Sequence, residues 1–373
     1  MIIARRNYLL SLSIIPILLL IMLLTTITIP TIHAEAIPTS TLPKPTSSCT
    51  IFTVALGDTV FYGNNEDYTQ RTLRLWYIPA QNLSTIEGEV SIYGGVYIGF
   101  HNDEHGRLYP NICGGMNEHG LIFDINGLPS LPLQDNPNGS TFYTNHSIHI
   151  HASLWDCKTV DEVITWYQTH KWDATIGGQI HYADASGDAV VISVNPSTNT
   201  WAYTRKTGHF IVSTNFNLND SSNRYYDPYN RYKTASQMLS QIHHEANLTV
   251  QACADILYAV HREGECHTLY SNIFDPVHLD VYFNYGENYQ HQKRIHLPDM
   301  LNQPHTFEEL NATQITGVDS HLLIKTEKID EDFYTPAIDP LLLTVYAATL
   351  AVSTISLALV VYIHRRRKTK LSN

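Results

Sequence analysis

The chain has 373 residues, with 23 Lys and Arg against 35 Asp and Glu, and a formal net charge of −12. Seven of the basic residues but only one acid lie at the two ends, so residues 37–340 carry 16 bases and 34 acids, a net charge of −18. Nucleic-acid binding needs a positive surface, so this charge excludes nucleic acid as a partner.

The N-terminus has the features of a secretory signal. Arg5 and Arg6 precede an apolar run at 8–29, and Ala34 and Ala36 form an Ala-x-Ala site. This pattern predicts a signal peptide over residues 1–36, cleaved after Ala36. Because the apolar run is long, an uncleaved N-terminal anchor is the alternative.

Residues 37–48 are rich in Pro, Ser and Thr and are expected to form an extended linker or propeptide. Cys49 then stands directly before a β-branched run, Thr50–Leu56, that predicts a strand. A cysteine at the first position of a domain can act as a nucleophile if the linker is removed. Its freed α-amine, with an ordinary pKa of about 7.7–8.0, then serves as the base.

A hairpin is expected next, because Gly57 and Asp58 separate the first strand from a second at Thr59–Tyr62. The following stretch, Gly63–Tyr68, is predicted to be a polar loop that returns to the start of the first strand. This geometry would bring Asp67 near Cys49, where a carboxylate could orient the amine. A turn or capping role for Asp67 is the alternative.

The rest of the exterior part alternates short strands with a few helices. Residues 113–120 read as a glycine-rich turn, and 129–140 as a loop. Thr159 or Asp161 is expected near the start of a helix. Further strands are expected at 73–79, 90–100, 121–125, 179–183, 189–194, 201–205, 210–214, 268–274 and 279–285, and helices at 149–170, 231–246 and 250–262. Because no βαβ alternation is present, the fold class is α+β with mostly antiparallel sheets.

The C-terminus predicts a single membrane crossing. Residues 341–363 are uncharged and almost wholly apolar, long enough for a helix of roughly 35 Å. Cations at 365–368 follow at once, so the tail, 364–373, is expected in the cytoplasm and the catalytic part outside. Residues 317–340 are expected to be a juxtamembrane stalk. The six glycosylation sequons all lie in the exterior part, at Asn82, Asn138, Asn145, Asn219, Asn247 and Asn311.

Other chemistries find less support in the sequence. The spacing of His146, His149 and His151 could place two imidazoles on one face, but no matching carboxylate or cysteine pattern accompanies them, so we expect no metal. No phosphate-loop Lys follows Gly114 and Gly115, and no cofactor is expected. The five cysteines leave one unpaired if four form disulfides, in any of three connectivities, and position favours Cys49 as the free thiol.

Five motifs occur in a recognisable order: Cys-Thr at 49–50, Gly-Asn-Asn-Glu-Asp at 63–67, Gly-Met-Asn-Glu-His-Gly-Leu at 115–121, Asp-Ala-Ser-Gly-Asp at 184–188 and Ser-Thr-Asn at 213–215. Over residues 49–295 the chain resembles the choloylglycine hydrolase and penicillin V acylase family, the linear-amide hydrolases. The resemblance implies an N-terminal-nucleophile hydrolase fold, an αββα sandwich of two antiparallel sheets between helical layers.

The resemblance also implies roles for individual residues. Cys49 would be nucleophile and base, and Asp67 would hydrogen-bond its amine. Asn215 and a backbone N–H near Asn126 would form the oxyanion hole, with Gly127 the alternative position. Arg231 matches a family arginine, for which Arg224 is the other candidate.

One position departs from the family, since bile-salt hydrolases carry Arg where this chain has Asn64. That cation helps to lower the pKa of the thiol. Without it, thiolate formation depends on the amine, Asp67 and Arg231, and specificity for bile salts is not implied. Asn64 itself could still position the nucleophile by hydrogen bonds.

Together these observations predict an exported, membrane-anchored cysteine amidase with its hydrolase domain at 49–316 and a small-molecule N-acyl amide as substrate. An acyltransferase that passes the acyl group to an amine is one alternative, and a non-catalytic surface-binding module is another. The sequence leaves open whether the chain forms a homo-oligomer.

Overall fold

The computed structural model describes residues 47–69, 73–85, 88–101, 110–134, 136, 138–139, 150–172, 175–220, 227, 230–285, 289, 292–302 and 306–310. All belong to the second of two compact units, which begins at Thr46. The predicted signal peptide, stalk, membrane segment and tail lie outside the described residues. Among the residues that are described, no helix is both long and apolar enough to cross a membrane.

Two antiparallel sheets form the centre of the unit. The first has six strands in the order β12 (Phe210–Ser213), β1 (Ser47–Leu56), β2 (Thr59–Tyr68), β13 (His267–Asp275), β14 (Asp280–Tyr285) and β15 (Lys293–His296). The second has eight, in the order β11 (Trp201–Arg205), β10 (Ala189–Val194), β9 (Thr175–Ala183), β8 (Ile122–Pro132), β7 (Pro110–Asn117), β6 (Gly95–His101), β3 (Leu73–Ile78) and β16 (Thr306–Leu310). A separate hairpin pairs β4 (Gln81–Thr85) with β5 (Gly88–Ile92).

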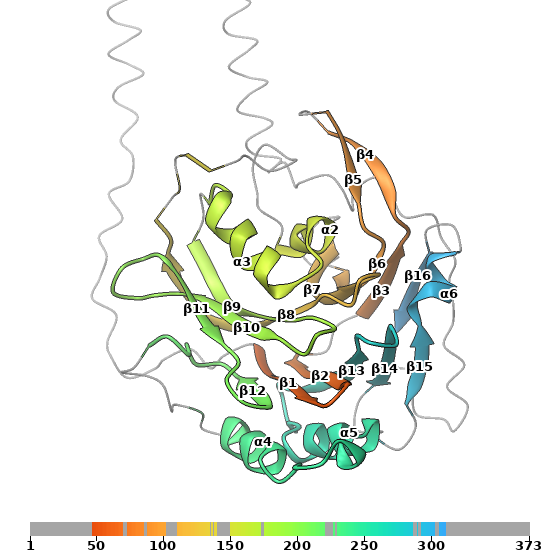
Figure 1. Cartoon of the computed structure of the whole chain (residues 1–373). Coiled ribbons are helices and arrows are strands. Elements are labelled where there is room, and N and C mark those ends of the chain that lie inside the picture. The colour runs from red at the N-terminus through yellow and green to blue at the C-terminus, as the bar shows by residue number, and fades with distance from the viewer. Residues whose placement is uncertain are drawn as a thin grey trace, which may run out of the picture. The chain divides into compact units, whose positions relative to one another are not determined.

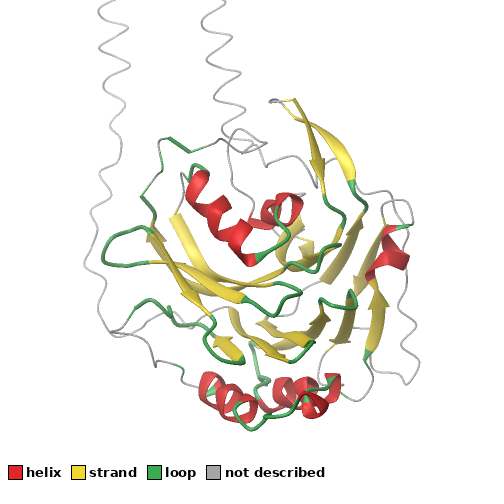
Figure 2. Cartoon of the chain, in the orientation of Figure 1, coloured by secondary structure: helices red, strands yellow, loops and turns green. Residues whose placement is uncertain are grey.

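Helices cover the outer face of each sheet (Figures 1 and 2). The short α2 (Ser153–Asp156), which follows the 3-10 turn η1 (Ile150–Ala152), and α3 (Val160–Thr169) lie over the eight-stranded sheet. The six-stranded sheet is covered by α4 (Arg231–Leu239) and α5 (Val250–Ala259), with η2 (Glu245–Asn247) between them, and α6 (Leu297–Leu301) follows β15. The prediction of two antiparallel sheets is confirmed.

The alternation of side chains along the strands produces three apolar layers. On β1, Ile51 packs between the sheets, whereas Phe52 packs toward α4 and α5. On β2, Tyr62 faces the other sheet and Phe61 faces the helices. A third layer, which includes Trp155, joins the eight-stranded sheet to α2 and α3. Neighbouring residues of β1 and β2 therefore face different environments.

Several predicted elements were wrong in their extent. The stretch Gly63–Tyr68 is not a loop, because β2 continues to Tyr68 and its residues 63–67 are buried. Strand β7 runs to Asn117, so only the end of the expected glycine-rich turn is a turn. The helix expected at 149–170 is interrupted before Thr159, which caps α3 as predicted by accepting from the N–H of Glu162.

Among the described residues, the structure does not contain the two disulfides that the cysteine count allowed. Cys157 is a free thiol in the apolar layer beneath α2 and α3, and Cys253 is a free thiol in the layer beneath α4 and α5. Each is buried in a different layer, so neither can reach the other. Cys49 is also a free thiol.

Candidate active site

Cys49 lies near the start of β1, directly opposite Glu66 of β2. Its side chain is buried. Further along the hairpin, Gly63 lies opposite Phe52, and a Cβ at that glycine would stand 2.4 Å from the Phe52 ring. The lack of a side chain at Gly63 thus lets the two strands pair in this register, which sets Cys49 against Glu66.

The sulfur of Cys49 faces the space between the two sheets. Its Sγ donates to Oε2 of Glu66 over 3.2 Å. On the same face of β2, the amide of Asn64 donates to Oδ2 of Asp124, on β8, over 2.8 Å. All four of these side chains are buried, so the thiol lies in a cluster of polar side chains that includes two carboxyls.

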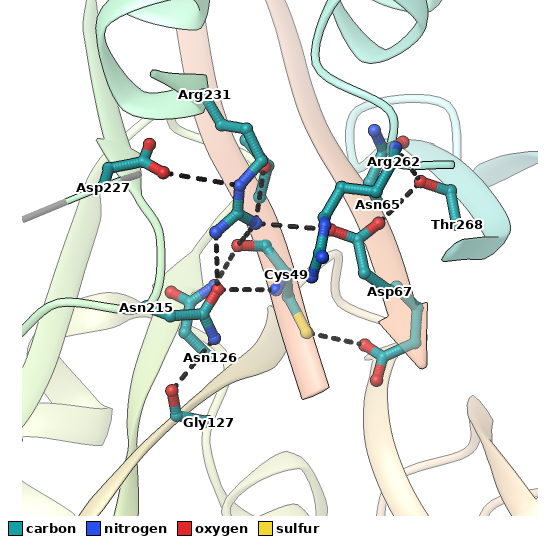
Figure 3. A network of polar contacts seen from close by, with 12 residues as sticks. Cys49, Asn65, Asp67, Asn126, Gly127, Asn215, Asp227, Arg231, Arg262 and Thr268 are labelled. Carbon is teal, nitrogen blue, oxygen red and sulfur yellow. Dashed lines mark hydrogen bonds and ion pairs between the residues drawn. The ribbon is translucent and has the colours of Figure 1, made fainter. Parts of the chain in front are cut away.

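The main-chain atoms of Cys49 contact a different set of side chains (Figure 3). Its nitrogen donates to Oδ1 of Asn215 over 2.8 Å. Its carbonyl oxygen accepts from Nη1 of Arg231 over 3.0 Å and from Nδ2 of Asn126 over 3.3 Å. Asn215 in turn donates to the carbonyl of Gly127 over 2.9 Å.

Arg231 connects these contacts to the helix-covered face of the sheet. It is the first residue of α4, and Asn230 before it has a left-handed backbone with φ of 55°. The guanidinium donates to Asp67 over 3.3 Å and to Oδ1 of Asn215 over 2.9 Å, and it faces Asp227 at 3.6 Å. Asp67 also accepts from the hydroxyl of Thr268 over 2.6 Å, so both of its oxygens are bonded.

Burial dominates the electrostatics of the site. It raises the pKa of Glu66 to about 8, while the hydrogen bond from Cys49 opposes the rise. It raises the pKa of Asp67 to about 7, against the opposing charge of Arg231. The pKa of Asp124 is raised by burial and by Glu66. Burial and the three carboxyls also raise the pKa of the Cys49 thiol well above its ordinary value.

The structure brings most of the predicted site residues into one network. Asp67, Asn126, Asn215 and Arg231 all lie within one or two contacts of Cys49. The predicted bond between Asp67 and the nitrogen of residue 49 is absent from this uncut chain. There the nitrogen is an amide whose single hydrogen goes to Asn215, and Asp67 reaches Cys49 through Arg231.

Two other expectations have different outcomes. Asn64 lies on the opposite face of β2 from Asp67 and contacts Asp124 rather than the network around Arg231. Arg224 lies outside the described residues, and of the two candidate arginines the structure describes Arg231. Among the residues described, no group of three His, Cys, Asp or Glu could hold a metal. His146 and His149 lie outside them, and His151 contacts the rings of Tyr97 and Trp155.

Sequence reasoning missed Glu66 and Asp124, the two acids beside the sulfur. The signal for Glu66 was present, because a strand through residues 63–68 places alternate residues on one face. Asn64 and Glu66 then share the face of Cys49. No comparable signal pointed to Asp124 or to Thr268, which come from strands distant in the sequence.

Comparison with known proteins agrees with this architecture. The sequence model of a family described as acyl-coenzyme A:6-aminopenicillanic acid acyl-transferase matches residues 54–290. No curated protein matches the chain.

Solved structures of amide hydrolases share the fold. A mutant of the conjugated bile acid hydrolase from Clostridium perfringens has a TM-score of 0.51 at 14% identity, over 72% of this chain and 100% of the hydrolase. The penicillin V acylase from Agrobacterium tumefaciens has a TM-score of 0.53 at 14% identity, over 70% of this chain and 91% of the acylase. The chain therefore belongs to the acyl-coenzyme A:6-aminopenicillanic acid acyl-transferase family, in the choloylglycine hydrolase and penicillin acylase group.

Proposed function

We propose that this protein is an N-terminal-cysteine amidase that hydrolyses a linear N-acyl amide through a thioester on Cys49. The observation that carries the proposal is the separation of contacts at residue 49. Its nitrogen is held by Asn215 and its carbonyl by Arg231, whereas its sulfur is left on the other face. A single residue that presents both an amine and a thiol needs this kind of support.

The proposed reaction begins once the segment ending at Ser48 has been removed. The freed α-amine of Cys49 takes the proton of its own thiol, and Sγ attacks the substrate carbonyl. The substrate amine leaves, and water hydrolyses the thioester. Arg231 and Asp67 keep the backbone of residue 49 in place during both steps.

Donors for the oxyanion come from two positions in this proposal. The side-chain amide nitrogen of Asn215 has two hydrogens and donates one to the carbonyl of Gly127, so the other can be donated to the oxyanion. A backbone N–H near Asn126 supplies the second donor. The ladder between β8 and β9 is irregular between Gly127 and Leu131, directly after Asn126 in the chain.

The side chains around the sulfur bear on the substrate class. Glu66 and Asp124 are acids whose pKa is raised by burial, so neither offers a positive charge to an anionic acyl group. Asn64 occupies the position of the family arginine and supplies no compensating charge. We therefore propose an uncharged or cationic amide as substrate rather than a conjugated bile acid.

Acyl transfer to an amine is the second candidate function, and the description of the matching family favours it. The two functions share the acyl-enzyme and differ only in what attacks the thioester. Incubation of enzyme and amide substrate with a second amine distinguishes them. Exchange of the acyl group onto the added amine supports transfer, and free acid as the sole product supports hydrolysis.

The location proposed for the enzyme is the outer side of a membrane, anchored by residues 341–363. The exposure of Asn82, Asn138 and Asn247 agrees with attachment of glycans there. The amide of Asn219 instead donates to Ser193 over 2.7 Å, so this sequon is expected to stay unmodified. Glycopeptide mass spectrometry of the chain from a secretory host tests both statements.

The central experiment uses the full-length chain in detergent. Intact-mass analysis is expected to find Cys49 as the first residue of the active form, and a panel of N-acyl amides is expected to contain a substrate. Cys49→Ala should abolish turnover, whereas Cys253→Ala, which removes a buried thiol from the apolar layer beneath α4 and α5, should retain it. An active chain that still begins at residue 37, or full activity of Cys49→Ala, would refute the proposal.

A further inference from the structure

The uncut chain has no α-amine at residue 49, so its thiol needs another base. The nitrogen of Cys49 is still part of the peptide bond to Ser48, and an amide nitrogen does not accept a proton near neutral pH. Any cleavage that the chain performs on itself must therefore use a side chain. In the structure the thiol donates to one such group, the carboxyl of Glu66 at 3.2 Å.

We propose that Glu66 is the base for the cleavage that frees Cys49, taking the thiol proton while Sγ attacks the carbonyl carbon of Ser48. The assignment rests on the proposed function, because it presupposes a mature chain that begins at Cys49. The two residues are direct partners across β1 and β2, and both side chains are buried. Their contact is therefore fixed by the sheet itself.

The bonds and protons of the step balance as follows. The bond from Sγ to the carbonyl carbon of Ser48 forms as the thiol proton passes to Glu66. The C–N bond between Ser48 and Cys49 then breaks, and Glu66 returns the proton to the leaving nitrogen. Water hydrolyses the resulting thioester, which releases a segment that ends in the carboxylate of Ser48 and restores the thiol.

The contacts around residue 49 suit this step. Oδ1 of Asn215 holds the leaving nitrogen at 2.8 Å, and Arg231 and Asn126 hold the next carbonyl. The sulfur and the nitrogen of Cys49 are thus bound by different groups, so proton transfer to Glu66 does not disturb the peptide. After cleavage the same nitrogen becomes the α-amine of the proposed amidase.

Several titratable groups interact with Glu66. Those that face it are Cys49 on β1, Asp124 on β8, Tyr270 on β13 and Cys266 before β13, and Asp67 acts on it from the opposite face of β2. Burial and Asp67 raise the pKa of Glu66 to about 8, against the hydrogen bond from Cys49. A base with this pKa is efficient near neutrality. Because only the ionised form accepts a proton, the cleavage rate should rise with pH and level off above about 8.

Cell-free synthesis of the full-length chain provides uncut protein, and mass analysis over time follows release of the segment before Cys49. Glu66→Gln keeps the size of the side chain but accepts no proton, so cleavage should slow by at least about 100-fold. Glu66→Asp, with a shorter reach, should give an intermediate rate. Asp280→Asn is the matched control, since it removes a buried carboxyl from the same sheet and should cleave like the wild type.

The outcomes separate this assignment from the proposed function. If Glu66→Gln cleaves at the wild-type rate, Glu66 is not the base. If the wild type stays uncut, the chain does not cleave itself and the assignment falls, whereas the proposed amidase then depends on another protease to free Cys49. If the wild type is cut but hydrolyses no amide, only the proposed amidase falls. Should Glu66→Gln misfold, the wild-type pH profile decides, and a cleavage rate that is constant between about pH 5 and 9 overturns the assignment.

Discussion

Near residue 49, the buried acids on the two faces of the β1–β2 pair have different hydrogen-bond partners. On the face covered by α4 and α5, Asp67 accepts from Arg231 and Thr268. On the face between the sheets, Glu66 contacts the Cys49 thiol, and Asp124 contacts Asn64. Among the described residues no cation contacts either of these two carboxyls.

Adjacent residues lie on opposite faces because the strand is pleated, so Glu66 and Asp67 enter different environments one residue apart. On the helix-covered face Arg231 lies beside the acid, and the pair holds the backbone of Cys49. On the face between the sheets no such cation, among the described residues, opposes burial, and the pKa of Glu66 rises to about 8, compared with about 7 for Asp67. The comparison indicates that one face positions residue 49 and the other governs the protonation of its sulfur.

The largest effect is expected from loss of the cation on the helix-covered face. Arg231→Ala removes the guanidinium from Asp67, Asn215 and the Cys49 carbonyl. A buried carboxylate left without its partner costs about 3–5 kcal/mol of the free energy of unfolding. Urea unfolding measures the change, and amide turnover should be lost in the folded fraction.

Arg294→Ala is the control for that experiment. It also removes an arginine from a buried acid, Asp280, but Arg294 is largely exposed and solvent screens the pair. Its effect on stability should therefore be much smaller. Equal losses in the two variants would show that burial of the Arg231 pair has no special role.

The acids on the face between the sheets should be detected as a dependence of the free energy of unfolding on pH, rather than as one large loss of stability. In the unfolded chain the pKa of a glutamate is about 4.3, and in the folded chain burial raises that of Glu66 to about 8. Between these values the folded state keeps a proton that the unfolded state has released. The contribution of Glu66 to the free energy of unfolding therefore falls as pH rises through this window and is constant outside it.

Glu66→Gln removes this dependence, because the amide does not titrate. With Cys49→Ala in both chains to prevent cleavage, the two curves of stability against pH should diverge by up to about 1.4 kcal/mol per pH unit. The hydrogen bond from the thiol lowers the pKa of Glu66, so its loss in Cys49→Ala does not reverse the direction of the pKa shift. Parallel curves from urea unfolding between about pH 5 and 8 would contradict the raised pKa.

The sequence predicted more of the helix-covered face than of the face between the sheets. Asp67 and Asn215 stood in motifs whose order resembled a known family, and Arg231 was one of two matches to a family arginine. The hairpin signal at Gly57 and Asp58 placed β2 beside β1. The prediction of a loop at residues 63–68 was wrong because the polarity of these side chains was taken to mean exposure to solvent. A buried strand that is rich in polar side chains has the composition of a loop.

The remaining part of the site depends on contacts that no local pattern reports. Asp124 belongs to the eight-stranded sheet and meets Asn64 only because the two sheets stack. Thr268 meets Asp67 across a ladder that joins residues 201 positions apart in the chain. Glu66 could have been found from strand alternation alone, but its contact with the thiol depends on the strand register that pairs it with Cys49.

The smallest effect is expected where the helix-covered face has duplicate partners. The hydroxyl of Ser271 donates to Oδ1 of Asn65 over 2.6 Å, and the hydroxyl of Tyr289 lies 3.5 Å from the same oxygen. Asn65 also donates to the carbonyl of Leu257. In Ser271→Ala the tyrosine can replace the lost donor, so the cost should be about 0.5–1.5 kcal/mol by urea unfolding.

Amide turnover by Ser271→Ala should stay close to that of the wild type, because none of these groups contacts Cys49. Ser271→Ala combined with Tyr289→Phe removes both donors from Asn65, and the loss should then exceed the sum of the two single changes. Additive losses would mean that the hydroxyls do not substitute for each other. The helix-covered face would then be as sensitive to single deletions as the face that holds the sulfur.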